Sequence, residues 1–201
     1  MKSTNLFSFA VVALTALPFS LSAQTVVNLG TASTYGVVAG TTVTSTGLTV
    51  VNGDLGTSPG ATVTGFPTGV VNGSIHAGDS AAAQAHTDLV SAYNSVTGQS
   101  ATTSGVTAFA TTTLTPGVYN SAASISLTGV LTLDGNNLAN PVFVFQMGST
   151  LLMNGGTSIL LINGARAENV YWQVGSSATL GSASTFVGTV LAATSISLDP
   201  A

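Results

Sequence analysis

Short segments that alternate small polar and apolar residues recur along the chain. Residues 40–44 read Gly-Thr-Thr-Val-Thr, and residues 60–64 repeat the pattern as Gly-Ala-Thr-Val-Thr, twenty residues later. Such alternation predicts half-buried β-strands, because successive side chains of a strand point to opposite faces. A repeat of about twenty residues suits one coil of a solenoid with short strands on about three faces. The pattern therefore predicts a mostly β fold of stacked coils.

The second half of the chain can be aligned with itself in the same way. Thr132, Ser158 and Thr185 are spaced by 26 and 27 residues, and each precedes an apolar residue, in turn Leu133, Ile159 and Phe186. Because side chains alternate along a strand, we expect the hydroxyl column to point outward and the apolar column to point inward. Thr42, which precedes Val43, is assigned to the same outward column.

Residues 79–97 show a different period. Apolar residues recur every three or four positions, which predicts an amphipathic α-helix of about five turns. The apolar stripe consists of Ala82, Ala85, Leu89, Ala92, Tyr93 and Val96. Asp79 or Ser80 can cap the first turn, and Gly98 suits a left-handed residue after the last turn.

Two other segments differ in composition from the alternating strands. Residues 99–113 are rich in Ser, Thr and Gly, and they are predicted to form a loop. The segments around 143–145 and 171–174 hold Phe, Tyr and Trp, so we expect these strands in the core or beneath the helix.

The N-terminus has the features of a secretory leader. Residues 1–23 contain the positive Lys2, an apolar stretch at 6–17 and a small final residue, Ala23. The apolar stretch is too short to span a bilayer comfortably. We therefore expect removal of the leader, export of the chain, no membrane association afterwards, and one mature domain at 24–201.

Charge is almost absent from the chain. The formal net charge is −4, and Arg166 is the one basic side chain after residue 24. A nucleic-acid-binding surface needs clustered lysine or arginine, so this composition excludes nucleic acid as a partner. The chain has no cysteine, so core burial and backbone hydrogen bonds must supply its stability.

No constellation of side chains predicts catalysis or metal binding. His76 and Asp79 could touch a cation, but no third ligand is visible, and His86 stands alone on the predicted helix. The acidic residues are scattered, and no Gly-x-Ser-x-Gly elbow lies between a strand and a helix. Arg166 and Glu168 are predicted to form a surface ion pair. We therefore expect no enzyme activity, no cofactor and no bound metal.

An ordered set of short motifs connects the chain to a known family. The motifs are Leu-Gly-Thr-Ala at 29–32, Gly-Asp-Leu-Gly-Thr-Ser-Pro-Gly at 53–60, Val-Thr-Gly-Phe-Pro at 63–67, Leu-Thr-Pro-Gly-Val-Tyr at 114–119, Val-Phe-Val-Phe-Gln at 142–146, Leu-Ile-Asn-Gly-Ala at 161–165, Asn-Val-Tyr-Trp-Gln-Val-Gly at 169–175 and Phe-Val-Gly-Thr at 186–189. With these motifs the chain resembles the ice-binding proteins of cold-adapted fungi and bacteria. The resemblance covers nearly the whole mature chain.

The resemblance implies a right-handed β-helix of triangular cross-section, with one long α-helix packed alongside and one flat face that binds ice. It also implies a secreted, extracellular protein without a cofactor, and we expect a monomer that inhibits the growth and recrystallisation of ice. Relatives continue through another coil after the stretch that matches residues 195–198, whereas this sequence stops at residue 201. Either a final coil is missing, or the last edge of the solenoid is less protected.

The residues that we assign to the ice-binding face are Gly40, Thr42, Thr44, Thr132, Gly156, Ser158, Ser184 and Thr185. Strands stack about 4.7–4.9 Å apart, close to a repeat of the ice lattice, and the glycines are expected to keep the face flat. The main alternative is a structural or adhesive β-helix that binds cell-surface carbohydrate. A third alternative, a glycan-active enzyme, is disfavoured because the acidic residues do not cluster.

Overall fold

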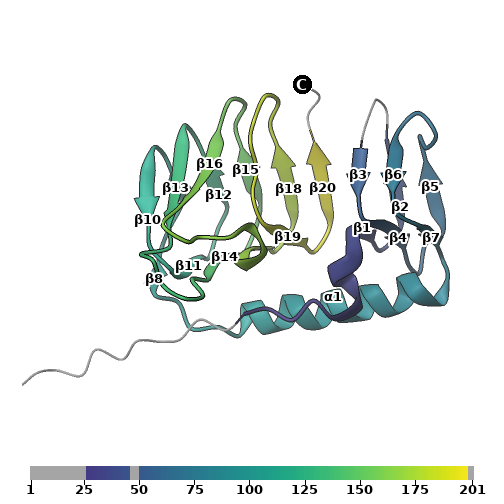
Figure 1. Cartoon of the computed structure of the whole chain (residues 1–201), viewed down its shortest axis with the longest axis horizontal. Coiled ribbons are helices and arrows are strands. Elements are labelled where there is room, and N and C mark those ends of the chain that lie inside the picture. Colours follow the sequence, from purple (N-terminus) through teal and green to yellow (C-terminus); the bar gives the residue numbers. More distant parts are fainter. Residues whose placement is uncertain (1–25, 46–49, 199–201) are drawn as a thin grey trace, which may run out of the picture.

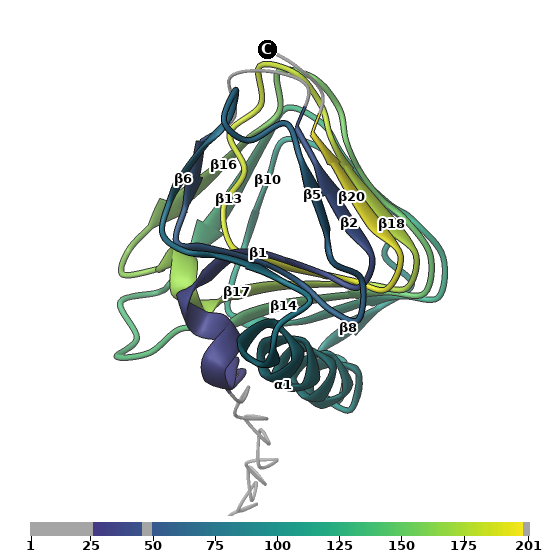
Figure 2. The same cartoon turned by 90° about the vertical axis from the view of Figure 1, so that its right-hand side faces the viewer.

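The computed structural model describes residues 26–45 and 50–198, which form a three-sided solenoid with one long α-helix alongside (Figure 1, Figure 2). The strand pairs in this part of the chain are parallel. The predicted β-helix class is therefore confirmed. The predicted leader at 1–23 lies outside the described residues.

The coils form two stacks, and the first occupies residues 35–77. Its strands pair at the predicted twenty-residue spacing, for example Thr42 with Thr62. Each of its three sheets lies on a different side of the solenoid. The sheets are β1 (Tyr35–Ala39), β4 (Asp54–Thr57) and β7 (Ile75–Ala77) on the helix side; β2 (Thr42–Thr44) and β5 (Thr62–Thr64) on the second side; and β3 (Val50–Asn52) and β6 (Val70–Asn72) on the third.

The second stack follows the helix and continues the same three sides. The helix side holds β8 (Thr103–Ser104), β11 (Gly117–Ser121), β14 (Phe143–Met147), β17 (Val170–Val174) and β19 (Thr189–Ala192). The second side holds β9 (Ala108–Phe109), β12 (Ile125–Leu127), β15 (Leu151–Met153), β18 (Ser177–Leu180) and β20 (Ser195–Leu198). The third side holds β10 (Thr112–Leu114), β13 (Val130–Asp134) and β16 (Ser158–Ile162), with Thr185 bridging to Ser158.

The prediction of a loop at residues 99–113 was wrong. This segment contains β8, β9 and the start of β10, which pair with the next coil. The strands have only two or three residues each, too few for local propensity to predict them, and pairing with neighbouring strands supplies their backbone hydrogen bonds.

The predicted helix is confirmed as α1 (Ser80–Thr97). Asp79 is its N-cap, and its carboxylate accepts a hydrogen bond from the backbone N–H of Ala82 at 2.9 Å. The prediction of a left-handed residue at Gly98 was wrong, because its φ is −76°. Instead, the last turn tightens, and the N–H of Gln99 donates to the carbonyl of Val96 at 3.1 Å. In the described ranges no helix is long and apolar enough to cross a bilayer.

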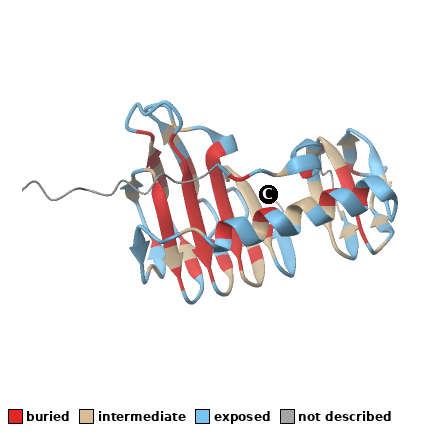
Figure 3. Cartoon of the chain, turned by 90° about the horizontal axis from the view of Figure 1, so that it is seen from below, coloured by how far each residue is buried: buried red, intermediate tan, exposed pale blue. Residues whose placement is uncertain are grey.

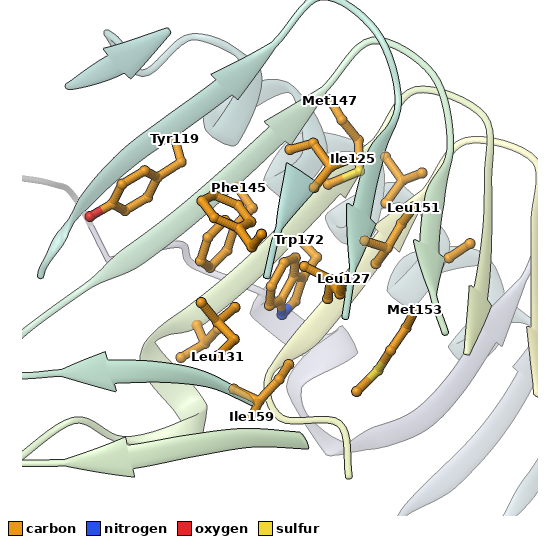
Figure 4. Packing of buried hydrophobic residues seen from close by; sticks show 14 of the residues in the cluster. Tyr119, Ile125, Leu127, Leu131, Phe145, Met147, Leu151, Met153, Ile159 and Trp172 are labelled. Atoms are coloured by element: carbon orange, nitrogen blue, oxygen red, sulfur yellow. The ribbon is translucent and has the colours of Figure 1, made fainter. Parts of the chain in front are cut away.

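The core is largest in the second stack. Figure 3 shows buried residues concentrated in the helix-side strands of the second stack, and Figure 4 shows side chains that fill the interior. Tyr119, Phe145 and Trp172 occupy one register position on β11, β14 and β17, and their rings stack along the solenoid axis. The predicted core position of the aromatic strands is confirmed, since all residues of β14 and β17 are buried.

The two stacks meet without strand pairing in the described residues: β19 and β20 have no partner among β1, β2 and β3 (Figure 1). The helix α1 contacts β1, β4 and β7 of the first stack and β14 and β17 of the second. The short 3-10 helix η1 (Gly30–Thr34) packs on α1, and η2 (Ala167–Asn169) precedes β17. At the edge of the second stack formed by β20, Ile196 pairs with the buried Ala178, but Ile196 remains 48% exposed.

Candidate functional site

Two sides of the solenoid are open to solvent, because α1 covers the third (Figure 2). The charged residues of the described ranges lie on β4, on α1 and its N-cap, on β13 and in the segment around η2; they are Asp54, Asp79, Asp88, Asp134, Arg166 and Glu168. The side formed by β2, β5, β9, β12, β15, β18 and β20 carries none of them. We call this side the hydroxyl face.

The part of the hydroxyl face on the first stack is a ladder of threonines. Residues 42–44 and 62–64 both read Thr-Val-Thr and pair in register. All four threonines are exposed, and the valines between them point inward and are half-buried. The hydroxyl of Thr64 donates to the hydroxyl of Thr44 at 3.2 Å. The two strands therefore present two parallel rows of hydroxyl and methyl groups.

The same two-row pattern occurs at the near edge of the second stack. Ser195 pairs with Ser177, and Ser197 pairs with Thr179. The hydroxyl of Ser195 donates to the hydroxyl of Ser177 at 2.9 Å. Between the rows Ala178 is buried, so its neighbours in sequence point outward. Figure 2 shows β18 and β20 on the same side of the solenoid as β2 and β5.

Further from the junction the rows become less regular. One row continues from Ser177 to Thr150 and Ser124, whose hydroxyl groups are bonded at 2.7 Å. The other row runs from Thr179 to Leu152 and Ser126. Leu152 is 44% exposed, so a large aliphatic side chain projects from a row of small polar ones.

The opposite open side has a different character. We call it the mixed face, and it consists of the outward residues of β3, β6, β10, β13 and β16 together with Thr185. It contains exposed aliphatic residues, in order Val50, Val70, Leu160 and Ile162. It also contains the carboxylate of Asp134, which accepts hydrogen bonds from the N–H of Asn136 at 2.8 Å and from the amide of Asn163 at 2.9 Å.

The structure does not bring the sequence-predicted site residues together on one face. Thr42 and Thr44 lie on the hydroxyl face, whereas Thr132, Ser158 and Thr185 lie on the mixed face. The prediction that Thr42 continues their column was therefore wrong. The physical reason is that an outward hydroxyl followed by an inward apolar residue occurs on every side of a three-sided solenoid, so the pattern does not identify the side.

Within the mixed face, the predicted alignment of Thr132 with Ser158 was also wrong. Ser158 pairs with Val130, and Thr132 pairs with Leu160. The turn before β13 spans residues 128–129, whereas the turn before β16 spans residues 154–157, and the longer turn shifts the register by two residues. Ser158 and Thr185 do form a parallel bridge, as their column required.

The remaining predicted residues lie at corners. Gly40 is in the turn between β1 and β2, and a Cβ there would be 3.6 Å from Nε2 of His86. Gly156 is in the turn before β16 with a φ of +72°. Ser184 is in the turn before Thr185, and its hydroxyl donates to the carbonyl of Gly181. These three residues shape turns rather than the centre of either face.

Sequence reasoning missed most of the hydroxyl face. The residues that were not singled out are Thr62, Thr64, Ser177, Thr179, Ser195 and Ser197. The available signal was the repeated hydroxyl-x-hydroxyl triplet, as in Thr-Val-Thr at 62–64 and Ser-Ile-Ser at 195–197, each centred on an apolar residue. The twenty-residue repeat already aligned residues 40–44 with 60–64. Because Thr42 was assigned to the ice-binding face, the same alignment could have assigned Thr62 to that face as well.

The histidine and carboxylate groups act in the scaffold around α1. Nδ1 of His76 lies 2.7 Å from Oδ2 of Asp79. The pKa of Asp79 is lowered by the hydrogen bond from the N–H of Ala82 and by the bond to His76. Arg166 and Glu168 are 3.8 Å apart and exposed, in agreement with the predicted surface pair. Among the described residues, no three His, Cys, Asp or Glu side chains gather as a metal site.

A second carboxylate fixes the N-terminal segment to the helix. Asp88 of α1 accepts hydrogen bonds from the hydroxyl and the N–H of Thr31, both at 2.7 Å. These bonds, with one from the amide of Gln84, lower the pKa of Asp88. The segment η1, which directly precedes the first stack, is thus tied to α1 by polar contacts as well as by packing.

Comparison with known proteins gives the family. The family model described as ice-binding-like matches residues 37–201. An ice-binding protein of Nostoc sp. (strain HG1) is 46% identical over 191 residues, which cover 94% of this chain and 70% of the relative. An ice-binding protein of Flavobacterium frigoris (strain PS1) is 30% identical over 199 residues, which cover 90% of this chain and 71% of the relative.

The fold agrees with this assignment. The crystal structure of an ice-binding protein from the Antarctic ascomycete Antarctomyces psychrotrophicus superposes with a TM-score of 0.83 at 38% identity, covering 87% of this chain and 96% of that one. Sequence, coil architecture and solved structures thus agree, and the chain belongs to the ice-binding-like family.

Proposed function

We propose that this protein adsorbs to ice through the hydroxyl face and thereby inhibits the growth and recrystallisation of ice crystals. The observation that carries the proposal is the pair of in-register rows at the junction of the two stacks, with Thr42 and Thr62 in one part and Ser177 and Ser195 in the other. These rows are outward-facing and free of charge in the described residues. Adsorption needs no catalytic step, so the function requires no enzyme chemistry.

The spacing of the rows supports binding to a crystalline lattice. Neighbouring strands of a sheet lie about 4.7–4.9 Å apart, so equivalent hydroxyl groups repeat at nearly that distance. A threonine offers a hydroxyl that can hold one water of the lattice and a methyl group that can occupy a groove between waters. A charged side chain would keep its own hydration shell and interrupt this order.

Rigidity reduces the entropy that adsorption costs. Immobilising a flexible side chain costs about 0.5–1.5 kcal/mol on binding. Threonine is restricted at χ1 because it is β-branched. The hydroxyl bonds between Thr64 and Thr44 and between Ser195 and Ser177 hold these side chains further in place before ice arrives. The many weak contacts of such a face can therefore add up to stable adsorption.

The mixed face suits ice less well. The carboxylate of Asp134 lies on it, and Leu160 and Ile162 are 49% and 40% exposed. A charge and bulky aliphatic side chains interrupt a flat template. We therefore place Thr132, Ser158 and Thr185 outside the ice-binding face, and we keep Thr42 and Thr44 within it.

A pair of matched substitutions tests the assignment. Thr42 on the hydroxyl face and Thr185 on the mixed face are both exposed, so tyrosine can replace either without entering the core. We expect Thr42→Tyr to abolish most of the gap between melting and freezing points and to leave the labelled protein off a growing crystal. Thr185→Tyr should keep both activities. Circular dichroism and thermal unfolding verify the fold of each variant.

The outcomes separate the face from the function. Loss in Thr185→Tyr with retention in Thr42→Tyr would move the ice-binding site to the mixed face. If the unmodified chain produces no freezing gap and stays in the liquid while a crystal grows through it, ice binding itself is refuted.

We further propose that the protein works outside the cell as a monomer, after removal of residues 1–23. Intact mass of the protein recovered from the culture medium of its source, with sedimentation at several concentrations, tests these points. A product that retains the leader, or one that self-associates at micromolar concentration, contradicts them.

A further inference from the structure

The outer coil of the first stack carries a triplet that no part of the ice-binding site uses. Residues 72–74 read Asn-Gly-Ser, the one Asn-x-Ser/Thr triplet in the sequence with a residue other than Pro in the middle. Such a triplet is the acceptor signal for N-linked glycosylation in exported proteins. We propose that Asn72 is a site of N-linked glycosylation.

The triplet is accessible. Asn72 is the last residue of β6, and Gly73 and Ser74 form the turn to β7. All three residues are exposed. The strand alternates so that Val71 points inward and Asn72 points outward. Glycosylation of Asn72 therefore needs no rearrangement of the coil.

The hydrogen bonding of Asn72 is compatible with a glycan. Its Nδ2 donates one hydrogen bond, at 2.9 Å, to Oδ1 of Asn52, which is the residue of β3 that pairs with Asn72. A glycosylated asparagine keeps one hydrogen on Nδ2, because only one is replaced. The ladder between Asn52 and Asn72 can therefore persist in the modified protein.

The surroundings of Asn72 give the glycan a physical role. Val50 and Val70 form the adjacent row of the same sheet and are 58% and 51% exposed, and Ile75 is 47% exposed just beyond the triplet. In the described residues β6 pairs only with β3, so its outer edge is open. Exposed edges and apolar patches favour association between copies. A bulky hydrophilic glycan at Asn72 would screen both.

The position also avoids the hydroxyl face. Figure 2 places β6 on the side of the solenoid opposite β2 and β5. A glycan on Asn72 would extend away from the rows that contain Thr42 and Thr62. The modification thus adds solubility without covering the surface proposed for ice.

The reaction is a glycosyl transfer to an amide nitrogen. The co-substrate is an oligosaccharide linked to a lipid diphosphate, and the catalyst is the oligosaccharyltransferase of a secretory membrane. A bond forms between Nδ2 of Asn72 and the anomeric carbon of the first sugar, while the bond from that carbon to the diphosphate oxygen breaks. The lipid diphosphate leaves with the electron pair, and the amide nitrogen gives up one proton. Ser74 supplies the hydroxyl that the enzyme recognises.

Translation of the full chain with endoplasmic-reticulum microsomes tests the proposal. Only translocated chains, identified by protease protection, are scored, and a known glycoprotein is translated in the same reaction as a positive control. We expect the unmodified sequence and Ser74→Thr to gain one glycan, seen as one mass step that peptide N-glycosidase removes. Asn72→Gln and Ser74→Ala should gain none, whereas Asn52→Gln, which disrupts only the ladder, should still be modified.

The removal step is run in heavy-oxygen water, so that the aspartate left at position 72 carries the label. This separates glycan removal from earlier spontaneous deamidation of Asn72 in its Asn-Gly sequence, which leaves an unlabelled aspartate. Translocated chains of the unmodified sequence that stay at their bare mass, while the control glycoprotein is modified, overturn the proposal. The readout is a mass and does not depend on ice, so it can fail independently of the ice-binding proposal.

Discussion

The rings of Phe145 and Trp172 stack with centroids 3.9 Å apart and planes 8° from parallel. The two residues are register partners on β14 and β17. Tyr119 extends the column on β11, with its ring 5.4 Å from that of Phe145. A solenoid whose coils stack through rigid rings resists bending along its axis, which a flat outer template requires.

This column should be a main source of stability. Trp172 is fully buried, and its indole N–H donates to the carbonyl of Val187 at 3.0 Å. We expect Trp172→Ala to lower the free energy of unfolding by about 3–5 kcal/mol, because it leaves a cavity beside Phe145. Urea unfolding measures the loss. Leu160→Ala, at a side chain that is 49% exposed, is the control and should cost far less. Similar losses for the two variants would contradict this account of the core.

Leu152 should limit ice adsorption. It interrupts one row of the hydroxyl face between Ser126 and Thr179. We expect Leu152→Thr to increase the freezing gap, because it restores a small β-branched hydroxyl side chain at an exposed position. The matched control is Leu160→Thr on the mixed face, which should leave the gap unchanged. An increase in the control alone would point to the mixed face instead.

Gln146 should hold the end of α1 on the second stack. It is buried, and its Nε2 donates to the carbonyls of Val96 at 2.6 Å and Gln99 at 2.9 Å. Its Oε1 accepts from the amide of Asn120 at 3.0 Å. We expect Gln146→Leu to cost about 1–3 kcal/mol, because buried polar partners lose their bonds. Hydrogen exchange should rise at residues 94–99 and not at the first turn of α1. Uniform exchange along the helix would argue against this local role.

Acid should weaken the contact between η1 and α1. The pKa of Asp88 is lowered mainly by hydrogen bonds from Thr31, so the folded state favours the ionised carboxylate. This contribution is complete above the ordinary carboxyl pKa of about 3.9 and is lost as pH falls through the lower folded value. We expect Asp88→Asn to lower Tm at neutral pH and to reduce the further fall in Tm on acidification. Thermal unfolding of the parent chain and the variant at neutral pH and at acidic pH measures both effects. Glu168→Gln is the control. If Asp88→Asn has the same Tm and the same acid sensitivity as the parent chain, the lowered pKa of Asp88 does not contribute to stability.

The sequence was sufficient for the class of fold and for its most regular parts. The period of residues 79–97 predicted α1 and its cap at Asp79 because a helix leaves a strong local pattern. Pairing between Thr42 and Thr62 followed from a repeat of constant length. The weaker signal at residues 99–113 failed because two-residue strands depend on their neighbours rather than on their own composition.

The candidate site was harder to predict than the fold. Alternation tells which residues point outward, but every side of the solenoid alternates in the same way. Turn length decides the side and the register, and the difference between residues 128–129 and 154–157 moved Ser158 away from Thr132. Only the three-dimensional arrangement separates the row of Thr42 from that of Thr185.

The absence of strand pairing between the two stacks, within the described residues, has a mechanical consequence for the proposed template. The hydroxyl rows of β2 and β5 belong to the first stack, and those of β18 and β20 belong to the second. Backbone hydrogen bonds therefore do not fix the position of one set of rows relative to the other. Instead α1 sets the distance and the rotation between the two stacks, because Ala82 lies next to Gly56 of the first stack, and Ala92 and Val96 pack on the second. A stretch or rotation of α1 by a fraction of a turn would move the two sets of hydroxyl rows out of register with a single ice lattice, while each coil would stay folded.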